Sequence, residues 1–211
     1  MDINEKYKDL WQLKEDTYRT IDFDMPLIIY MDGKHITSNH KKYNLLKIPN
    51  FSNDLIDSAE KTCLKLHLSA ELYAGIDELA LIIREPSILK EFDVGDNANY
   101  INLIFMQHFL KIFWEKYPEV VFKSTIFNIS NENISRYIEY RKEICYSGAL
   151  WYIAKEYLPK EDYKELTAST DMENLLKERN LWQYFEENTQ LRSGIYKSVS
   201  ILDNIIASRF V

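Results

Sequence analysis

Three acidic residues stand beside short apolar runs that have the composition of buried β-strands. Asp32 directly follows the run at residues 27–31, and Asp77 and Glu78 directly precede the run at residues 79–83. Two carboxylates that lie a few ångströms apart repel each other unless a cation lies between them. Hard oxygen ligands of this kind select Mg²⁺ or Mn²⁺. Asp32 and Asp77 are therefore candidate metal ligands, and Glu78 is a further ligand or a residue that orients one.

The elements around these acids predict how they meet. Strands are expected at residues 27–31, 69–74, 79–83 and 120–129, and helices at 4–20, 51–66, 98–117 and 130–155, with Ser52 or Asn53 and then Ser130 as N-caps. The order β-α-β-β-α-β, followed by helical pieces, predicts an α+β fold with a split-βαβ, ferredoxin-like antiparallel sheet, a palm. Its strand order 4-1-3-2 places the first and third strands side by side. Asp32 and Asp77 then meet at one edge of the sheet.

Paired carboxylates at such an edge suit nucleotidyl transfer. A two-metal site activates an attacking oxygen and stabilises the leaving pyrophosphate of an in-line displacement. Gly33 lets the backbone pass close to a bound triphosphate, and its carbonyl is a further candidate ligand. The alternative is that each aspartate is an ordinary turn residue, because Asp-Gly after a strand and Gly-x-Asp-Glu in a hairpin are both common turns. The pair in this strand order is more specific than either residue alone.

A basic loop follows the first acid. No acidic residue lies between Asp32 and Asp54, in a chain whose net charge is -7, and the loop carries Lys34, His35, His40, Lys41, Lys42 and Lys47. This imbalance predicts a cluster that faces a triphosphate or RNA, with an ordinary solvated loop as the alternative. Farther along, Arg136, Arg141 and Lys142 either face a phosphate or pair with Glu139 and Glu143 on the surface.

Composition narrows the class of protein. The 211 residues suit one domain or a core with an appendage, and we place a palm-like core at 1–130 and a mainly helical extension at 131–211. The net charge of -7 excludes a strongly basic nucleic-acid binder. Two cysteines without a CxxC motif argue against a disulfide framework. With no signal peptide or membrane span in the sequence, we expect a cytoplasmic protein without a membrane partner.

Four segments, in order along the chain, resemble the tRNA-histidine guanylyltransferase family, the 3′–5′ polymerases. PLIIYMDGKHIT resembles the first metal motif of that family, and LYAGIDELALII resembles its second motif, a Ser-Asp-Glu hairpin. IFNISNENISRYIEYRKEI resembles the segment that reaches the Trp-Arg-Gln helix. ELTASTDMENLLKERNLWQYFEENTQLRSGIYK resembles the closing motif. The resemblance thus extends over most of the chain and agrees with the predicted palm.

The resemblance implies a specific activity and site. It implies that nucleotides from NTPs, with GTP favoured and ATP also bound, are added to the 5′ end of an RNA such as tRNA. It implies two Mg²⁺ ions, or Mn²⁺, held by Asp32, the Gly33 carbonyl and Asp77, with Asp32, Asp77 and Glu78 as catalytic residues. Family members form homo-oligomers, so we expect a dimer or tetramer. The residues expected to bind nucleotide or phosphate are Lys34, His35, Ile36, Thr37, Lys47, Arg141, Lys142 and Arg192.

The chain departs from the family pattern where the family reads its substrate. Ile76 replaces the serine before the second aspartate, Thr37 replaces a histidine, and Tyr140-Arg141-Lys142 replaces Trp-Arg-Gln; Ile144, Ser147 and Gly148 replace an Asp and an Arg-Asn pair. The metal pair is kept while the RNA-reading residues are altered, so the acceptor stays open.

Two other functions remain open from the sequence. The turn Gly-Ile-Asp-Glu also resembles the paired-acid turn of CRISPR-type palm cyclases, which would join NTPs into cyclic or linear oligonucleotides. A non-catalytic protein that binds nucleotide or RNA is the other alternative, although the retention of both aspartates argues against it.

Overall fold

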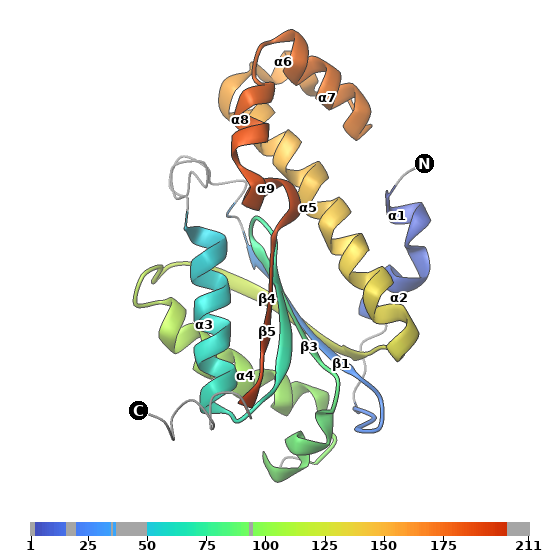
Figure 1. Cartoon of the computed structure of the whole chain (residues 1–211), viewed down its shortest axis with the longest axis vertical. Coiled ribbons are helices and arrows are strands. Elements are labelled where there is room, and N and C mark those ends of the chain that lie inside the picture. Colours follow the sequence, from blue (N-terminus) through green and yellow to red (C-terminus); the bar gives the residue numbers. More distant parts are fainter. Residues whose placement is uncertain (1–2, 16–19, 35, 37–49, 93–94, 202–211) are drawn as a thin grey trace.

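The fold is built on an antiparallel sheet whose strands lie in the order β4-β1-β3-β2-β5 (Figure 1). The computed structural model describes residues 3–15, 20–34, 36, 50–92 and 95–201. The strands are β1 (Leu27–Lys34), β2 (Ala70–Ala74), β3 (Glu78–Ile83), β4 (Val121–Asn128) and β5 (Ile195–Val199). The helices are α1 (Ile3–Lys6), α2 (Lys8–Glu15), α3 (Phe51–Lys65), α4 (Ala98–Phe113), α5 (Ile134–Tyr157), α6 (Lys160–Tyr163), α7 (Ser169–Glu178), α8 (Trp182–Glu187) and α9 (Thr189–Ser193), with short 3-10 turns at Pro86–Phe92 and Asn131–Asn133.

Helices cover both faces of the sheet. On one face lie α3 and α4, and Phe122 of β4 meets the rings of Phe109 and Phe113 of α4 at centroid distances of 5.6 and 5.5 Å. On the other face lies α5, whose Arg141 carbonyl accepts a hydrogen bond of 3.2 Å from the Tyr73 hydroxyl of β2. Because both faces are covered, β1 and β3 are almost continuously apolar rather than alternating. The long helix α5 continues past the end of the sheet and carries α6, α7 and α8 (Figure 1).

The structure confirms the predicted element order and the strand order 4-1-3-2. It adds β5 at the edge beside β2, in the C-terminal part of the chain, where no strand was expected from the sequence. This strand comes from the C-terminal part of the chain, whereas the division of the chain near residue 130 stays a prediction. No helix in the described residues is long and apolar enough to cross a membrane.

Several predicted boundaries were wrong. β1 does not stop before Asp32 but continues through Lys34, because β3 and β4 both pair with it there. The first helix is interrupted at Tyr7 and described only to Glu15, and α4 ends at Phe113 instead of residue 117.

The predicted caps of α3 were also wrong. α3 begins after Asn50, and Ser52 does not cap it, because its hydroxyl donates to the Gly75 carbonyl at 2.8 Å. Ser130 occupies an N-cap position without a side-chain hydrogen bond to the backbone. Ser52 thus ties α3 to the hairpin between β2 and β3.

Candidate active site

Asp32 lies inside the sheet, near the end of β1. Its register partners are Glu78 on β3 and Lys123 on β4. Residues that face each other across antiparallel strands project from the same face, so these three side chains form a row on the face covered by α5. The Asp32 side chain is 35% exposed, and the Lys34 ammonium lies 3.4 Å from its Oδ2 atom. The first acid therefore stands at the rim of the sheet, open to solvent.

Asp77 is held beside β1 by its own main chain. The Gly33 N–H donates to the Asp77 carbonyl at 2.8 Å, and the Gly75 N–H donates to the Glu78 carbonyl at 2.9 Å, which closes the hairpin turn. Burial and, to a smaller extent, the nearby Asp32 carboxylate raise the pKa of the Asp77 carboxyl to about 7, although Arg141 and Lys155 act in the opposite direction. Asp32 is thus close enough to disfavour the charge of Asp77, an effect that a cation between the two acids would relieve.

Gly33 is needed where β1 passes the turn. A Cβ atom at this position would lie 2.9 Å from the Asp77 carbonyl oxygen and 2.2 Å from the Cδ1 atom of Ile36, which is itself buried. The absence of a side chain lets the two main chains approach. The glycine therefore sets the spacing between the two acids, a role that the sequence indicated only as access for a triphosphate.

Glu78 has a different environment from that of the two aspartates. It is buried, and Arg141 of α5 holds it in an ion pair in which the Arg141 Nε donates to Oε1 at 2.9 Å. The Tyr30 hydroxyl donates to Oε2 at 2.9 Å and accepts from Arg141 Nη2 at 2.9 Å. Burial also raises the pKa of the Tyr30 hydroxyl above its ordinary value. With its oxygens engaged in this way, Glu78 fits the second predicted role, which is to orient the turn that carries Asp77.

The other residues expected to bind nucleotide or phosphate lie in different surroundings. Arg141 is only 4% exposed, so neither a surface pair with Glu139 or Glu143 nor a direct phosphate contact matches its position. Lys34 and Lys142 are exposed, Arg192 on α9 is half-buried, and Ile36 is buried. The predicted site residues His35, Thr37 and Lys47, with His40, Lys41 and Lys42, lie outside the described residues. Arg136 pairs with Asp9 of α2 instead of facing a phosphate.

Four positions that depart from the family pattern lie on α5 or against it. Ile76 is buried, and Gly148 lies against it, since a Cβ atom on Gly148 would be 3.4 Å from Ile76 Cδ1. The Ser147 hydroxyl accepts a hydrogen bond of 3.1 Å from Ser169 of α7, and Ile144 is half-buried. Gly148 and Ile76 therefore pack α5 against the hairpin turn, and Ser147 connects α5 to α7.

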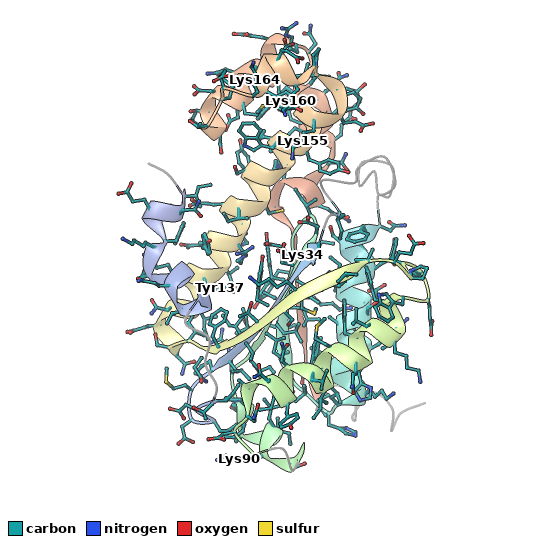
Figure 2. The ribbon with its side chains drawn as sticks, turned by 180° about the vertical axis from the view of Figure 1, so that it is seen from behind. Lys34, Lys90, Tyr137, Lys155, Lys160 and Lys164 are labelled. Carbon is teal, nitrogen blue, oxygen red and sulfur yellow. The ribbon has the colours of Figure 1, made fainter. Side chains whose placement is uncertain are left out.

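Sequence reasoning missed Lys123. This exposed residue on β4 is the register partner of Asp32. The alternating pattern of β4, together with the predicted strand order, was the signal that could have placed Lys123 beside β1. Figure 2 shows Lys34 at the end of the sheet toward Lys155 and the C-terminal end of α5. Lys34 of β1 and Lys123 of β4 thus lie beside Asp32, and Lys155 of α5 is near enough to Asp77 to lower the pKa of its carboxyl.

The donor set fits a hard cation. In the described residues no group of three or more His, Cys, Asp and Glu side chains could hold a metal. Mg²⁺ is typically bound by one or two carboxylates, with water and substrate phosphates as its other ligands. Asp32 and Asp77, with the Gly33 carbonyl nearby, fit this pattern.

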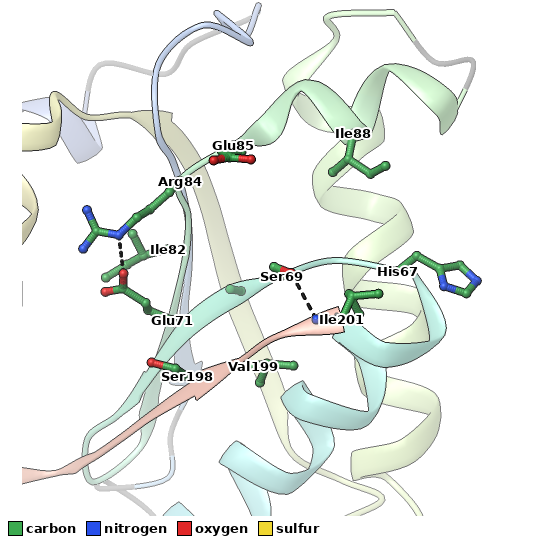
Figure 3. A pocket seen from close by; sticks show the side chains of 11 residues that line it. His67, Ser69, Glu71, Ile82, Arg84, Glu85, Ile88, Ser198, Val199 and Ile201 are labelled. Carbon is green, nitrogen blue, oxygen red and sulfur yellow. Dashed lines mark hydrogen bonds and ion pairs between the residues drawn. The ribbon is translucent and has the colours of Figure 1, made fainter. Parts of the chain in front are cut away.

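A cavity of about 560 Å³ lies elsewhere (Figure 3). It is lined by the start of β2, the end of β3 and the end of β5, including Glu71, Arg84 and Val199. Glu71 and Arg84 form an ion pair, and the Ile201 N–H donates to the Ser69 hydroxyl at 3.2 Å. The acid pair is at the other end of β3, so this cavity is not part of the candidate active site.

Two solved structures match nearly the whole chain. One is a bacterial tRNA(His) guanylyltransferase-like protein in complex with ATP, with a TM-score of 0.58 and 18% identity over 96% of this chain and 95% of that chain. The other is tRNA(His) guanylyltransferase from Saccharomyces cerevisiae, with a TM-score of 0.60 and 18% identity over 94% of this chain and 97% of that chain. The chain shares their fold. A scan against family models and a search of curated proteins find no match.

This structural similarity confirms the resemblance at the level of the fold. It covers 96% and 94% of this chain, so most of the C-terminal part from α6 to β5 belongs to the shared architecture as well as the palm-like sheet. At 18% identity the similarity establishes the fold and leaves the activity to be argued from the site.

Proposed function

We propose that this protein is a metal-dependent nucleotidyltransferase that adds nucleotides from NTPs, with GTP favoured, to an RNA 5′ end in the 3′–5′ direction. The observation that carries the proposal is the position of Asp32 and Asp77, brought together by the Gly33–Asp77 hydrogen bond at one end of an antiparallel sheet. Supporting it, a protein of the same fold is described in complex with ATP, and the ordered motifs resemble those of the guanylyltransferase family.

Asp32, Asp77 and the Gly33 carbonyl would hold two Mg²⁺ or Mn²⁺ ions. When bound, such ions neutralise charge on the transferring phosphate and make the attacking hydroxyl more acidic. Burial and the charge of Asp32 disfavour the ionised form of Asp77. A cation bound between the two acids would favour that form, so the site is suited to binding one. Ligands from substrate phosphates would complete the shell, so the site would be complete only with nucleotide present.

The neighbouring residues hold the acids in place. The Arg141–Glu78 pair and the Tyr30 hydroxyl fix the residue after Asp77, and Gly33 fixes the main chain on the other side. Preorganised charge of this kind costs no rearrangement during reaction. We propose that Lys34, whose ammonium lies 3.4 Å from Asp32, contacts the triphosphate. By the family resemblance, His35, Ile36, Thr37 and Lys47 remain proposed nucleotide contacts, and Lys142 and Arg192 remain proposed phosphate contacts.

One observation favours a second candidate, the joining of NTPs to one another without RNA. The segment from α6 to α9, residues 160–193, has eight Asp and Glu against five Lys and Arg, so its net charge is -3. An acidic surface repels the RNA backbone. If this lobe lies along the acceptor, a small nucleotide acceptor suits it better than a tRNA.

A product assay tests the proposal. Labelled NTPs with Mg²⁺ are incubated with bulk tRNA and without RNA, and the products are identified by mass spectrometry. Label on an RNA 5′ end supports the first function, and a small oligonucleotide formed without RNA supports the second. Binding of NTP with no product in either reaction would leave only the non-catalytic alternative.

Two variants connect the activity to the site. Asp32→Asn and Asp77→Asn should each lose transfer, whereas Asp171→Asn on the exposed surface of α7 should keep it. Full activity of Asp77→Asn with Mg²⁺ present would show that the acid pair was wrongly assigned. Light scattering tests the accompanying proposal that the protein is a dimer or tetramer.

A further inference from the structure

Lys123 extends the row of charged side chains across the sheet. Glu78, Asp32 and Lys123 are consecutive register partners on β3, β1 and β4. Lys34 is paired with Val121, which makes Lys34 and Lys123 diagonal neighbours on the same face. Such diagonal positions are about 7–8 Å apart. Asp32 is therefore flanked by two lysines from two strands.

The ammonium group of Lys123 has no hydrogen-bond or ion-pair partner among the described residues, and the residue is exposed. Glu78, at the other end of the row, is already neutralised by Arg141. β4 is the outer strand of the sheet on this side, and Lys123 stays exposed although α5 covers the same face farther in.

The charges at this position suit a phosphate chain. Lys34 is 43% exposed and Asp32 35% exposed, so the group between the lysines is accessible to a ligand. A divalent cation on Asp32 would cancel the attraction of Asp32 for the lysines. Both ammonium groups would then be free to bind the oxygens of a polyphosphate, with Lys acting as a point charge.

We propose that Lys123, together with Lys34, binds the β- and γ-phosphates of the NTP substrate. The assignment rests on the proposed function for the chemistry that follows binding, while binding itself can be tested separately. It predicts that the contribution of Lys123 grows with the number of phosphates on the ligand. A lysine that merely balanced the charge of Asp32 would show no such dependence.

Calorimetry with GTP, GDP, GMP and inorganic tripolyphosphate tests this proposal, with Ca²⁺ in place of Mg²⁺ to slow turnover. Lys123→Ala should weaken GTP and tripolyphosphate binding about tenfold, which equals about 1.4 kcal/mol, and should change GMP binding less than twofold. Lys123→Arg should restore most of the affinity. Lys111→Ala, which removes an exposed lysine from α4 on the opposite face, is the matched control and should bind like the wild type. Unfolding curves confirm that each variant is folded.

Each other result overturns the proposal. If Lys123→Ala binds GTP like the wild type, or loses GMP affinity as much as GTP affinity, Lys123 does not bind the outer phosphates. Tighter Ca²⁺ binding by Lys123→Ala without nucleotide, at an unchanged ratio of GTP to GMP affinity, would show that it only balances Asp32. A wild type that binds neither GTP nor tripolyphosphate also overturns it.

The proposal and the proposed function fail separately. Tight, Lys123-dependent binding without any product would reject nucleotidyl transfer and keep the phosphate contact. Asp77-dependent product formation with an unchanged KM for GTP in Lys123→Ala would reject only the phosphate contact.

Discussion

Two carboxylate–cation pairs lie on neighbouring strands of this sheet, and they differ in almost every respect. Glu78 and Arg141 are 8% and 4% exposed and share hydrogen bonds with Tyr30, whereas Asp32 and Lys34 are 35% and 43% exposed and meet at 3.4 Å. Asp77 directly precedes Glu78 and lies beside Gly33 of β1, whose N–H donates to the Asp77 carbonyl, and no side-chain cation is bonded to Asp77 in the described residues. The fold thus pairs Glu78 internally, and we propose that the other two acids hold an external cation.

The difference in burial between the two ion pairs indicates which acid stabilises the fold and which acids can bind a ligand. A buried ion pair can only be kept if every member is satisfied, because its desolvation cost is large. An exposed pair is weak and exchanges partners readily. Glu78 therefore belongs to the framework, while Asp32 and Asp77 keep unused ligand capacity at the end of the sheet.

The largest effect is expected when the buried pair is broken. Arg141→Met should lower the free energy of unfolding by about 3–5 kcal/mol, because it leaves the Glu78 charge buried without a partner. The double variant Glu78→Leu with Arg141→Met should recover most of this loss. Urea unfolding measures both, and Lys6→Met, which breaks the exposed pair with Glu143, is the control. Equal losses in the single and double variants would contradict the role given to the pair.

A smaller gain is expected from Asp77→Asn in the absence of metal. The pKa of Asp77 is about 7 in the folded protein against an ordinary 3.8, so between these values the folded state binds more protons than the unfolded state. The free energy of unfolding therefore falls as pH rises from about 4 to about 7 and is level above that. Asp77→Asn lacks this loss and should be more stable at pH 8, by at most about 4 kcal/mol.

Unfolding of the wild type and Asp77→Asn at pH 5 and pH 8 with EDTA measures this difference. Asp171→Asn should show no such pH-dependent change. A difference between the wild type and Asp77→Asn that is the same at both pH values would show that Asp77 is not held in a charge-disfavouring position.

Gly33→Ala tests the close approach of β1 to the turn. The added Cβ would meet the Asp77 carbonyl oxygen at 2.9 Å, and overpacking of this kind costs about 1–3 kcal/mol. Gly148→Ala is the control, because its Cβ would have an ordinary contact of 3.4 Å with Ile76 in the middle of α5; a helical alanine is favoured over glycine by about 1 kcal/mol. Equal thermal stability of the two variants would remove the steric argument for Gly33.

Divalent cation should stabilise the wild type through the acid pair. At a Mg²⁺ concentration ten times the Kd, the gain is about 1.4 kcal/mol. Asp77→Asn should lose most of this gain, and Asp171→Asn should keep it. The shift of Tm with Mg²⁺ measures the effect, and an undiminished shift in Asp77→Asn would place the cation elsewhere.

The smallest effect is expected for Lys34→Ala. The exposed Lys34–Asp32 pair contributes about 0–1 kcal/mol to stability, so the Tm should barely move while NTP binding weakens. A large loss of stability with unchanged NTP binding would show that the Lys34–Asp32 pair, like the buried pair, stabilises the fold and does not bind substrate.

Sequence patterns were sufficient for the layout of the site. The apolar runs at β1 and β3, with an acid at the end of one and the start of the other, predicted that Asp32 and Asp77 would meet, and the strand order confirms that arrangement. Hydrophobic periodicity carries this information because a buried strand must be apolar wherever it is covered. The strand β5 was missed because its alternation is short and its partner β2 lies far away in sequence.

What the sequence determined by itself is therefore the meeting of Asp32 and Asp77, the palm-like order of strands and the resemblance to the guanylyltransferases. Only the tertiary structure decided that Arg141 neutralises Glu78 and that Lys123 stands beside Asp32. The physical reason is that charged residues look alike in a sequence, whereas their roles depend on burial and on partners tens of residues away. The buried cation Arg141 pairs with Glu78, so the carboxylates of Asp32 and Asp77 are not bound to it.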